Sequence, residues 1–140
     1  MGSIEVFDHT ADVGLRIRGD DLADLFRTAA GGLVDYVVAN RGAVRVDRVD
    51  AVSLRADSTA ELLLAWLDEL IFLIETRHVL YARFEVDLSD DGLALEARLG
   101  GEAIDPGRHV LDHEVKAVTR HGATFGREGS GWVAEVILDI

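Results

Sequence analysis

Apolar and polar residues alternate over several short stretches of this chain, which is the pattern of strands with one face buried. At the N-terminal end, residues 4–6 and 13–17 alternate in this way, and a polar run at 8–12 separates them. The pattern returns at 80–88 and 93–99, which a Ser-Asp-Asp-Gly turn connects. Further strands are predicted at 43–46, 49–55, 114–120 and 132–140, with loops at 100–107 and 126–131.

Two segments have helical spacing instead. Apolar residues three and four positions apart predict a first helix over 22–37, capped by Asp20 or Asp21. The run Ser58-Thr59-Ala60-Glu61 has the form of a capping box at the start of a second helix. That helix extends to about Glu75 and is apolar around most of its circumference, so we expect it to be central and buried.

Two helices and several antiparallel strands predict the α+β class, as a single two-layer α/β domain with both helices packed on a mostly antiparallel sheet. The 140 residues, 49% of them hydrophobic, suffice for one core, and no linker or repeat divides them, so we expect one domain over 1–140. The first residues lack the regions of a signal peptide, and the apolar stretch at 62–74 is too short to span a bilayer. We therefore expect a soluble, cytoplasmic protein without membrane contact.

Charge and cysteine content narrow the chemistry. The chain has no cysteine, which excludes disulfides, thiolate nucleophiles and thiolate metal cages, so a metal would be held by oxygen or by oxygen and imidazole. The net charge of −12 repels phosphate backbones, so we expect no tight nucleic-acid binding. The acidic surface is compatible with binding to a basic protein. It is equally compatible with adaptation to a cytoplasm of high salt concentration.

Lysine occurs once, at Lys116, among 14 basic residues. Arginine and lysine differ in geometry and hydration. The lysine at this position therefore either has a specific role or occurs by chance in an arginine-rich chain.

The polar run between the first two strands gathers groups that bind metals. Asp8 and Asp12 stand four residues apart, with His9 between them. One interpretation is a metal or catalytic site, and the other is an ordinary turn whose Asp and Thr oxygens satisfy the turn backbone.

The other acidic group lies at the last strand, where Asp139 is next to the α-carboxylate of Ile140. Brought near Asp8 and Asp12, these hard oxygen groups would form a site for Ca²⁺ or Mg²⁺. The alternative is an exposed residue at a frayed end. Periodicity alone does not bring the two ends of the chain together.

Three histidines, His109, His113 and His121, occur within one short stretch. They suggest either a zinc site or solvated loop histidines. The chain has no phosphate-binding loop with lysine, no nucleophile elbow and no dinucleotide fingerprint, so its motifs specify no class of enzyme.

Four motifs, taken in order along nearly the whole chain, resemble the archease family. They are Asp8-His9-Thr10-Ala11-Asp12-Val13-Gly14, Trp66-Leu67-Asp68-Glu69-Leu70, Glu114-Val115-Lys116-Ala117-Val118-Thr119-Arg120-His121 and Ile137-Leu138-Asp139-Ile140. One departure is Arg120, where the family usually has an aromatic residue. If that ring packs on a partner, the contact differs here.

The resemblance implies an archease-like fold and an accessory role for the RtcB-type RNA ligase. That ligase joins 2′,3′-cyclic phosphate or 3′-phosphate ends to 5′-hydroxyl ends in tRNA splicing and RNA repair. It uses GTP and a divalent metal and forms a guanylylated histidine of its own. Archease-like proteins promote guanylylation and multiple turnover without catalysing ligation, so the resemblance implies a protein that is not itself an enzyme.

The resemblance also implies a divalent cation, Ca²⁺ first, with Mg²⁺ or Mn²⁺ as alternatives. Its ligands map onto Asp12, Asp139 and Ile140, and the supporting or partner-contact residues onto Asp8, His9 and Lys116. Two other functions stay open, a chaperone-like interaction module without a metal-dependent role and a metal-dependent phosphohydrolase.

Overall fold

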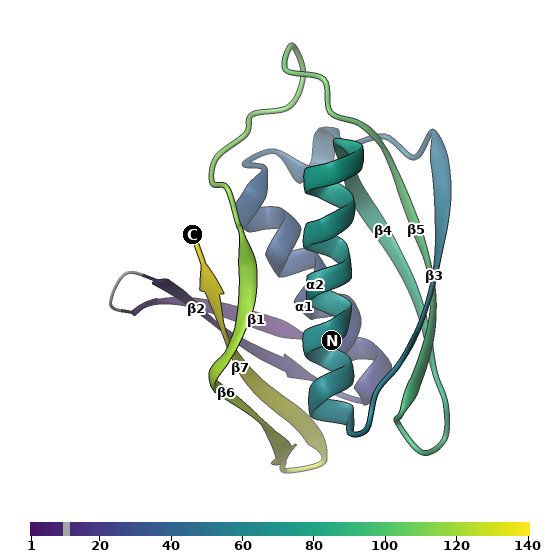
Figure 1. Cartoon of the computed structure of the whole chain (residues 1–140), viewed down its shortest axis with the longest axis vertical. Coiled ribbons are helices and arrows are strands. Elements are labelled where there is room, and N and C mark those ends of the chain that lie inside the picture. Colours follow the sequence, from purple (N-terminus) through teal and green to yellow (C-terminus); the bar gives the residue numbers. More distant parts are fainter. Residues whose placement is uncertain (10–11) are drawn as a thin grey trace.

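The structure is a computed structural model that describes residues 1–9 and 12–140, without the side chains of Asp8 and His9. Two helices and seven strands follow one another along the described chain (Figure 1). Their order is β1 (Ser3–His9), β2 (Asp12–Gly19), α1 (Leu22–Val37), a 3₁₀ turn η1 (Arg41–Ala43), β3 (Arg48–Arg55), α2 (Thr59–Arg77), β4 (Val79–Leu88), β5 (Ala94–Ala103), β6 (Ala117–Glu128) and β7 (Gly131–Asp139).

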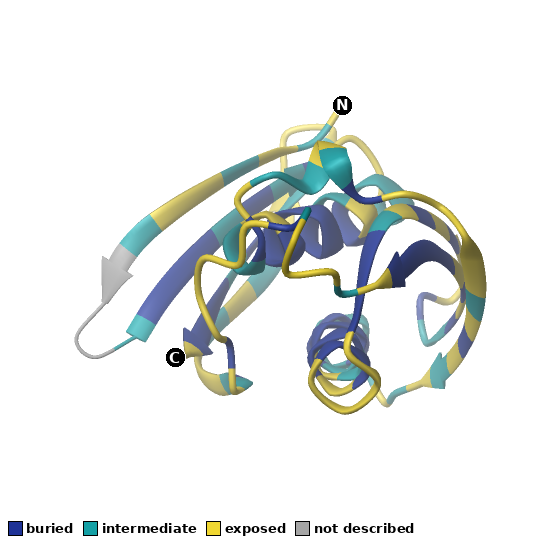
Figure 2. Cartoon of the chain, turned by 90° about the horizontal axis from the view of Figure 1, so that it is seen from above, coloured by how far each residue is buried: buried dark blue, intermediate teal, exposed yellow. Residues whose placement is uncertain are grey.

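The strands form two antiparallel sheets with the helices between them. One sheet has the order β1-β2-β7-β6 and the other the order β3-β5-β4. Helix α1 contacts both β2 and β4, while α2 contacts β6 and the three-stranded sheet. Figure 2 shows the buried faces of both helices between the sheets.

The α+β class and the two helices are confirmed. The division of the strands into two sheets was not predicted, because periodicity shows which residues face a core and not which strands pair.

Both helices begin where their caps predict. The Asp21 side chain accepts a hydrogen bond from the Asp24 amide at 2.8 Å, and the Ser58 hydroxyl accepts one from the Glu61 amide at 3.1 Å. These bonds satisfy amides that the first turn of a helix leaves free. Helix α2 ends where His78 takes a left-handed conformation (φ 54°).

Trp66 links the two helices at the centre of the core. Its side chain is fully buried, and the indole N–H donates to the carbonyl of Phe26 on α1 at 2.9 Å. Burying the ring removes a large apolar surface from water, and the hydrogen bond satisfies its one polar atom. This agrees with the prediction that the second helix is the central one.

Several strand boundaries differ from the sequence prediction, and β6 extends to Glu128, into the predicted loop at 126–131. Residues 43–46 form no strand, and β6 begins at Ala117, three residues after the predicted start. Residues 100–103, predicted as a loop, complete β5. At Gly101 a Cβ atom would lie 1.9 Å from the carbonyl oxygen of Leu80, so glycine is needed there for close strand packing and not for a turn.

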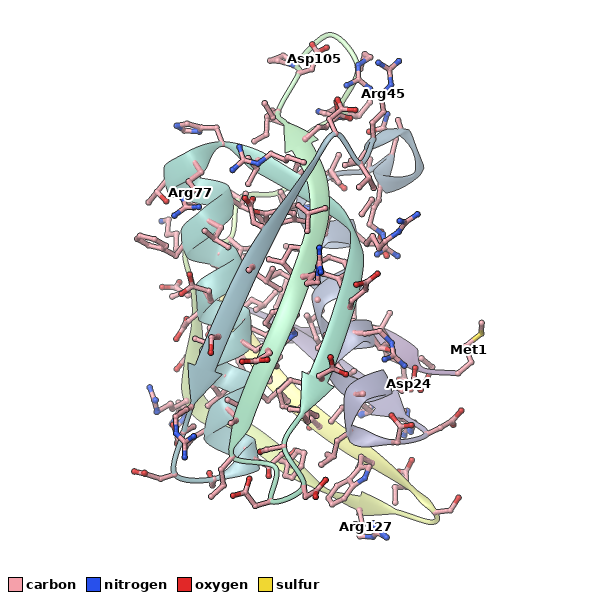
Figure 3. All side chains as sticks on the ribbon, turned by 90° about the vertical axis from the view of Figure 1, so that its right-hand side faces the viewer. Met1, Asp24, Arg45, Arg77, Asp105 and Arg127 are labelled. Atoms are coloured by element: carbon pink, nitrogen blue, oxygen red, sulfur yellow. The ribbon has the colours of Figure 1, made fainter. Side chains whose placement is uncertain are left out.

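The segment 104–116 crosses the end of the molecule at which both helices finish (Figure 1). Figure 3 shows Asp105 of this segment at the same end as Arg77, the last residue of α2. Among the described residues, neither helix is long and apolar enough to cross a membrane.

Candidate metal site

Asp12 and Asp139 face each other across neighbouring strands. They are directly opposed in the antiparallel register of β2 and β7. Opposed residues in such a pair have Cβ atoms about 4.5–5.5 Å apart, with both side chains on the same face of the sheet. The structure therefore brings together two carboxylates that are far apart in the sequence.

Both carboxylates belong to the outer face of the four-stranded sheet. Side chains alternate between faces along a strand, and the neighbours Val13 and Leu138 are buried on the side of the helices. Asp12 is half-buried and Asp139 is exposed. Ile140 follows Asp139 directly and is also exposed, so it lies at the end of the sheet where the family resemblance implies a third oxygen ligand.

This set of donors fits a hard divalent cation. Neighbouring carboxylates repel one another, and a bound cation removes that repulsion. Oxygen ligands are those that Ca²⁺, Mg²⁺ and Mn²⁺ prefer, and the chain has no cysteine to favour a softer metal. The outer face leaves room for water or a partner's groups to complete the coordination.

Strand β6 supports the Asp139 end of this pair. Ala117 is opposite Asp139, and the backbone N–H of Lys116 donates to the Asp139 carbonyl at 2.8 Å. The Lys116 side chain is exposed, and among the described residues it forms no ion pair. Its backbone thus fixes the strand end, while its ammonium stays accessible to a partner.

An aromatic ring lies beside the acidic pair on the same face. Phe7 is opposite Gly14 in the β1–β2 register, one row inward from Asp12. A Cβ atom on Gly14 would lie 2.2 Å from the Phe7 ring, so the ring rests directly on the strand. The Gly14 of the first motif therefore has a packing role beside the candidate site.

Arg16 packs against the same ring. Its guanidinium carbon is 5.3 Å from the ring centroid, and its nitrogens bond Glu135 at 2.6 Å and Glu5 at 2.9 Å. Hydrogen bonding from Arg18, followed by the charges of both arginines, lowers the pKa of Glu5. These ion pairs link β1, β2 and β7 on the face of the sheet that carries Asp12 and Asp139.

A bulge in β6 lies on the same face. The register between β6 and β7 shifts between Thr119 and Thr124. Gly122 has φ +78°, a conformation that suits glycine. A Cβ atom added to Gly122 would lie 3.3 Å from the side chain of Ile137. The bulge covers Ile137, two residues from Asp139, and so borders the candidate site.

Helix α2 bonds to β6 next to the site. The Asp68 carboxylate accepts a long hydrogen bond of 3.4 Å from the Val118 amide. Two nitrogens of Arg120 donate to Glu61 at 2.6 and 3.0 Å. At the position where the family resemblance implies an aromatic ring, the structure therefore has an exposed ion pair to the helix.

The three histidines of the zinc hypothesis have separate environments. His109 is buried against Glu102, His113 stacks on Tyr36 with ring centroids 4.2 Å apart, and His121 is exposed on β6. Among the described side chains, no three His, Cys, Asp or Glu groups lie close enough to hold a metal. Asp12 and Asp139 therefore have no third His, Cys, Asp or Glu ligand among the described side chains, and the third ligand stays a prediction.

Other parts of the first motif lie outside the described residues. The backbone of His9 is opposite Asp12 in the β1–β2 register. The side chains of Asp8 and His9, with residues 10–11, fall outside what the structure describes. The roles assigned to Asp8 and His9 from the sequence thus stay predictions.

Sequence reasoning missed the residues that frame the site. Phe7 carries no ligand atom, and nothing in the sequence pattern distinguishes it from the other apolar residues of the strands. The one available signal was Gly14, since a glycine within a strand often marks a close approach of another group.

The comparisons with known proteins show the family of this chain. The model of the archease protein family matches residues 4–140. The chain belongs to the archease family. The archease of Methanothermobacter thermautotrophicus is 37% identical over 142 residues, covering 100% of both chains.

Two solved structures share the archease fold of this chain. The solution structure of Methanobacterium thermoautotrophicum protein 1598 has a TM-score of 0.80 at 34% identity, covering 98% of each chain. The crystal structure of a Thermotoga maritima protein, described as an archease and possible chaperone, has a TM-score of 0.69 at 18% identity, covering 97% of this chain and 96% of that one. The second likeness shows the fold alone.

Proposed function

We propose that this archease is a metal-binding accessory protein of an RtcB-type RNA ligase in the cytoplasm. It promotes guanylylation of the ligase and multiple turnover, and so serves tRNA splicing and RNA repair without joining RNA itself. The observation that carries the proposal is the direct opposition of Asp12 and Asp139 across β2 and β7.

Asp12, Asp139 and the α-carboxylate of Ile140 would hold the cation, with Ca²⁺ as the first choice and Mg²⁺ or Mn²⁺ as alternatives. A bound divalent cation neutralises charge on phosphate groups during nucleotidyl transfer. The chain's own residues position this acidic end: the Lys116 amide fixes the Asp139 backbone, and Phe7 packs against the strand that carries Asp12.

The exposed Lys116 ammonium is then free to pair with an acidic group of the ligase. Asp8 and His9 would support the loop that precedes Asp12.

Multiple-turnover ligation by an RtcB-type ligase tests this proposal. The assay compares the wild type with Asp12→Ala, Asp139→Ala and a two-residue extension after Ile140. We expect each change to lower the stimulated rate at least tenfold, because each removes or displaces one oxygen ligand. Asp90→Ala, at the exposed β4–β5 turn, is the matched control and should stimulate fully. Full stimulation by all three site variants would contradict the metal role.

A chaperone-like module is the alternative, and the description of the Thermotoga maritima protein as a possible chaperone favours testing it. Suppression of client aggregation should then survive both chelation and Asp139→Ala. The ligase proposal expects stimulation to disappear under either treatment.

A further inference from the structure

A pocket opens where the two helices end, on a part of the molecule that the candidate metal site does not use. Val37 is the last residue of α1, Ile74 and Glu75 belong to the last turn of α2, and His78 caps α2. The segment 104–116 forms the opposite wall. The cavity measures about 320 Å³. This is near the lower end of the roughly 300–1,000 Å³ of small-molecule sites, so it suits one or two side chains of a partner.

The pocket has an apolar floor. Val37, Ile74, Ile104 and Leu111 line it. Ile74 is almost fully buried, whereas Leu111 is 52% exposed. An apolar floor with an exposed leucine at its edge favours an aliphatic group over a fully hydrated one.

The rim of the pocket is acidic. Glu75, Asp112 and Glu114 line it, and all three are exposed. The C-terminal ends of α1 and α2 add to the negative potential of the rim, since the C-terminal end of a helix carries a partial negative charge. No basic residue lies in the last turn of α1, whereas Arg77 lies in the last turn of α2, and His78 and His113 line the pocket beside the three carboxylates. The electrostatics of the rim therefore favour a cationic group.

The wall of the pocket is fixed before any partner binds. The Ala39 amide donates to the Val110 carbonyl and the Asp112 amide to the Val37 carbonyl, both at 2.8 Å. His113 stacks on Tyr36. Because these contacts hold the segment against the end of α1, a partner need not order it.

We infer that this pocket is a docking site for a partner protein's segment that combines aliphatic side chains with lysine or arginine. The aliphatic groups fill the floor formed by Val37, Ile74, Ile104 and Leu111, and the cations pair with Glu75, Asp112 and Glu114. Nucleic acid does not fit, because its phosphates would meet three carboxylates and two helix C-termini.

The wall of the pocket leads directly into the backbone that borders the candidate metal site. Glu114 is two residues before Lys116, whose amide bonds the Asp139 carbonyl. One partner can therefore contact both. Identifying that partner as the RNA ligase rests on the proposed function, whereas the chemistry of the pocket does not.

Titration of the ¹⁵N-labelled protein with a short amphipathic leucine–lysine peptide tests the pocket itself. We expect shifts of the amide resonances around Ile74, Ile104 and Leu111. The matched leucine–glutamate peptide should leave these resonances in place. Absence of shifts at the pocket, or equal shifts with both peptides, would overturn the inference. Equal shifts with spermidine alone would assign the pocket to a small polycation and overturn it as well.

Matched variants locate the contacts. Glu75→Lys and Glu114→Lys should each weaken peptide binding at least tenfold, whereas Asp90→Lys at the far β4–β5 turn should change it less than twofold. Leu111→Ser should weaken binding, and Val110→Ser, an equally exposed neighbour outside the pocket, should not. Equal affinities across all five variants would contradict the assignment.

Binding to an RtcB-type ligase separates this inference from the proposed function. If the wild type binds the ligase, Glu75→Lys and Glu114→Lys should bind it at least tenfold more weakly while keeping wild-type Ca²⁺ affinity. Wild-type binding by both variants would refute the ligase as occupant of the pocket. If the wild type itself does not bind the ligase, the proposed function fails, and the peptide titration alone decides the pocket.

Discussion

At the scale of single residues, Gly14 shows how a motif can combine ligand and support. The first motif contains both Asp12, a candidate ligand, and Gly14, on which the Phe7 ring rests. Any side chain at position 14 would displace the ring from the strand. Glycine is therefore needed here for the space above it, since its backbone conformation is not of the left-handed kind.

Gly14→Ala tests this account. The added methyl group displaces the Phe7 ring, and we expect a loss of about 1–2 kcal/mol in the free energy of unfolding by urea. In a Phe7→Ala background the same change should be neutral or slightly stabilising, because no ring remains to be displaced. Gly126→Ala on β6 is the control, since nothing lies within 4 Å of its added Cβ. An equal loss at both glycines, or additive effects of Gly14→Ala and Phe7→Ala, would refute the packing role.

The residue pattern alone gave Asp8, Asp12 and Asp139 as candidate ligands, because carboxylates beside strand ends stand out against apolar alternation, and the family resemblance then selected Asp12 and Asp139. It did not show that they are opposed. Pairing between strands far apart in the sequence leaves no local pattern, whereas the face on which a side chain lies does.

At the scale of elements, one buried carboxylate anchors the segment 104–116. Glu102, at the end of β5, accepts hydrogen bonds from the Arg45 amide at 2.6 Å and from Arg108, and its other contact is His109 Nε2 at 3.0 Å. The Asp105 amide donates to His109 Nδ1 at 2.9 Å, so the Nε2 nitrogen carries the proton and donates to Glu102. The sequence did not reveal this anchor, since Gly100 and Gly101 gave the region the pattern of a loop.

Glu102 makes this anchor sensitive to acid. The Arg45 amide, followed by Arg108 and His109, lowers the pKa of Glu102 from 4.5 to about 2. A carboxyl whose pKa is lower in the folded state stabilises the fold above its unfolded pKa, and the contribution is lost as the pH falls from about 4.5 towards 2.

Urea unfolding between pH 6 and pH 2.5 measures this contribution. Glu102→Gln should unfold at lower urea than the wild type at pH 6, and its unfolding midpoint should depend less on pH below 4.5. Glu5, Asp50 and Asp91 also have lowered pKa values, but they are present in both proteins and cancel in the comparison. Asp90→Asn is the control and should keep the wild-type pH profile. Parallel profiles for Glu102→Gln and the wild type would show that Glu102 does not anchor the segment.

At the scale of the whole molecule, the second strand and the last strand meet in one sheet. This pairing places Asp12 and Asp139 side by side and makes an acidic end from two distant parts of the chain. The sequence predicted both strands, the two helices and the α+β class from periodicity and caps. The sequence pattern did not predict the arrangement in two sheets, because strand order depends on contacts across the whole core.

The central claim is that one divalent cation is held between these two strands. An anomalous difference map from a crystal soaked in Mn²⁺ tests it most directly, since the map locates the ion without reference to activity. The account predicts a peak within about 2.0–2.4 Å of carboxylate oxygens of both Asp12 and Asp139 and of the α-carboxylate of Ile140. A map with no peak between these groups, or with its Mn²⁺ bound elsewhere, would contradict it.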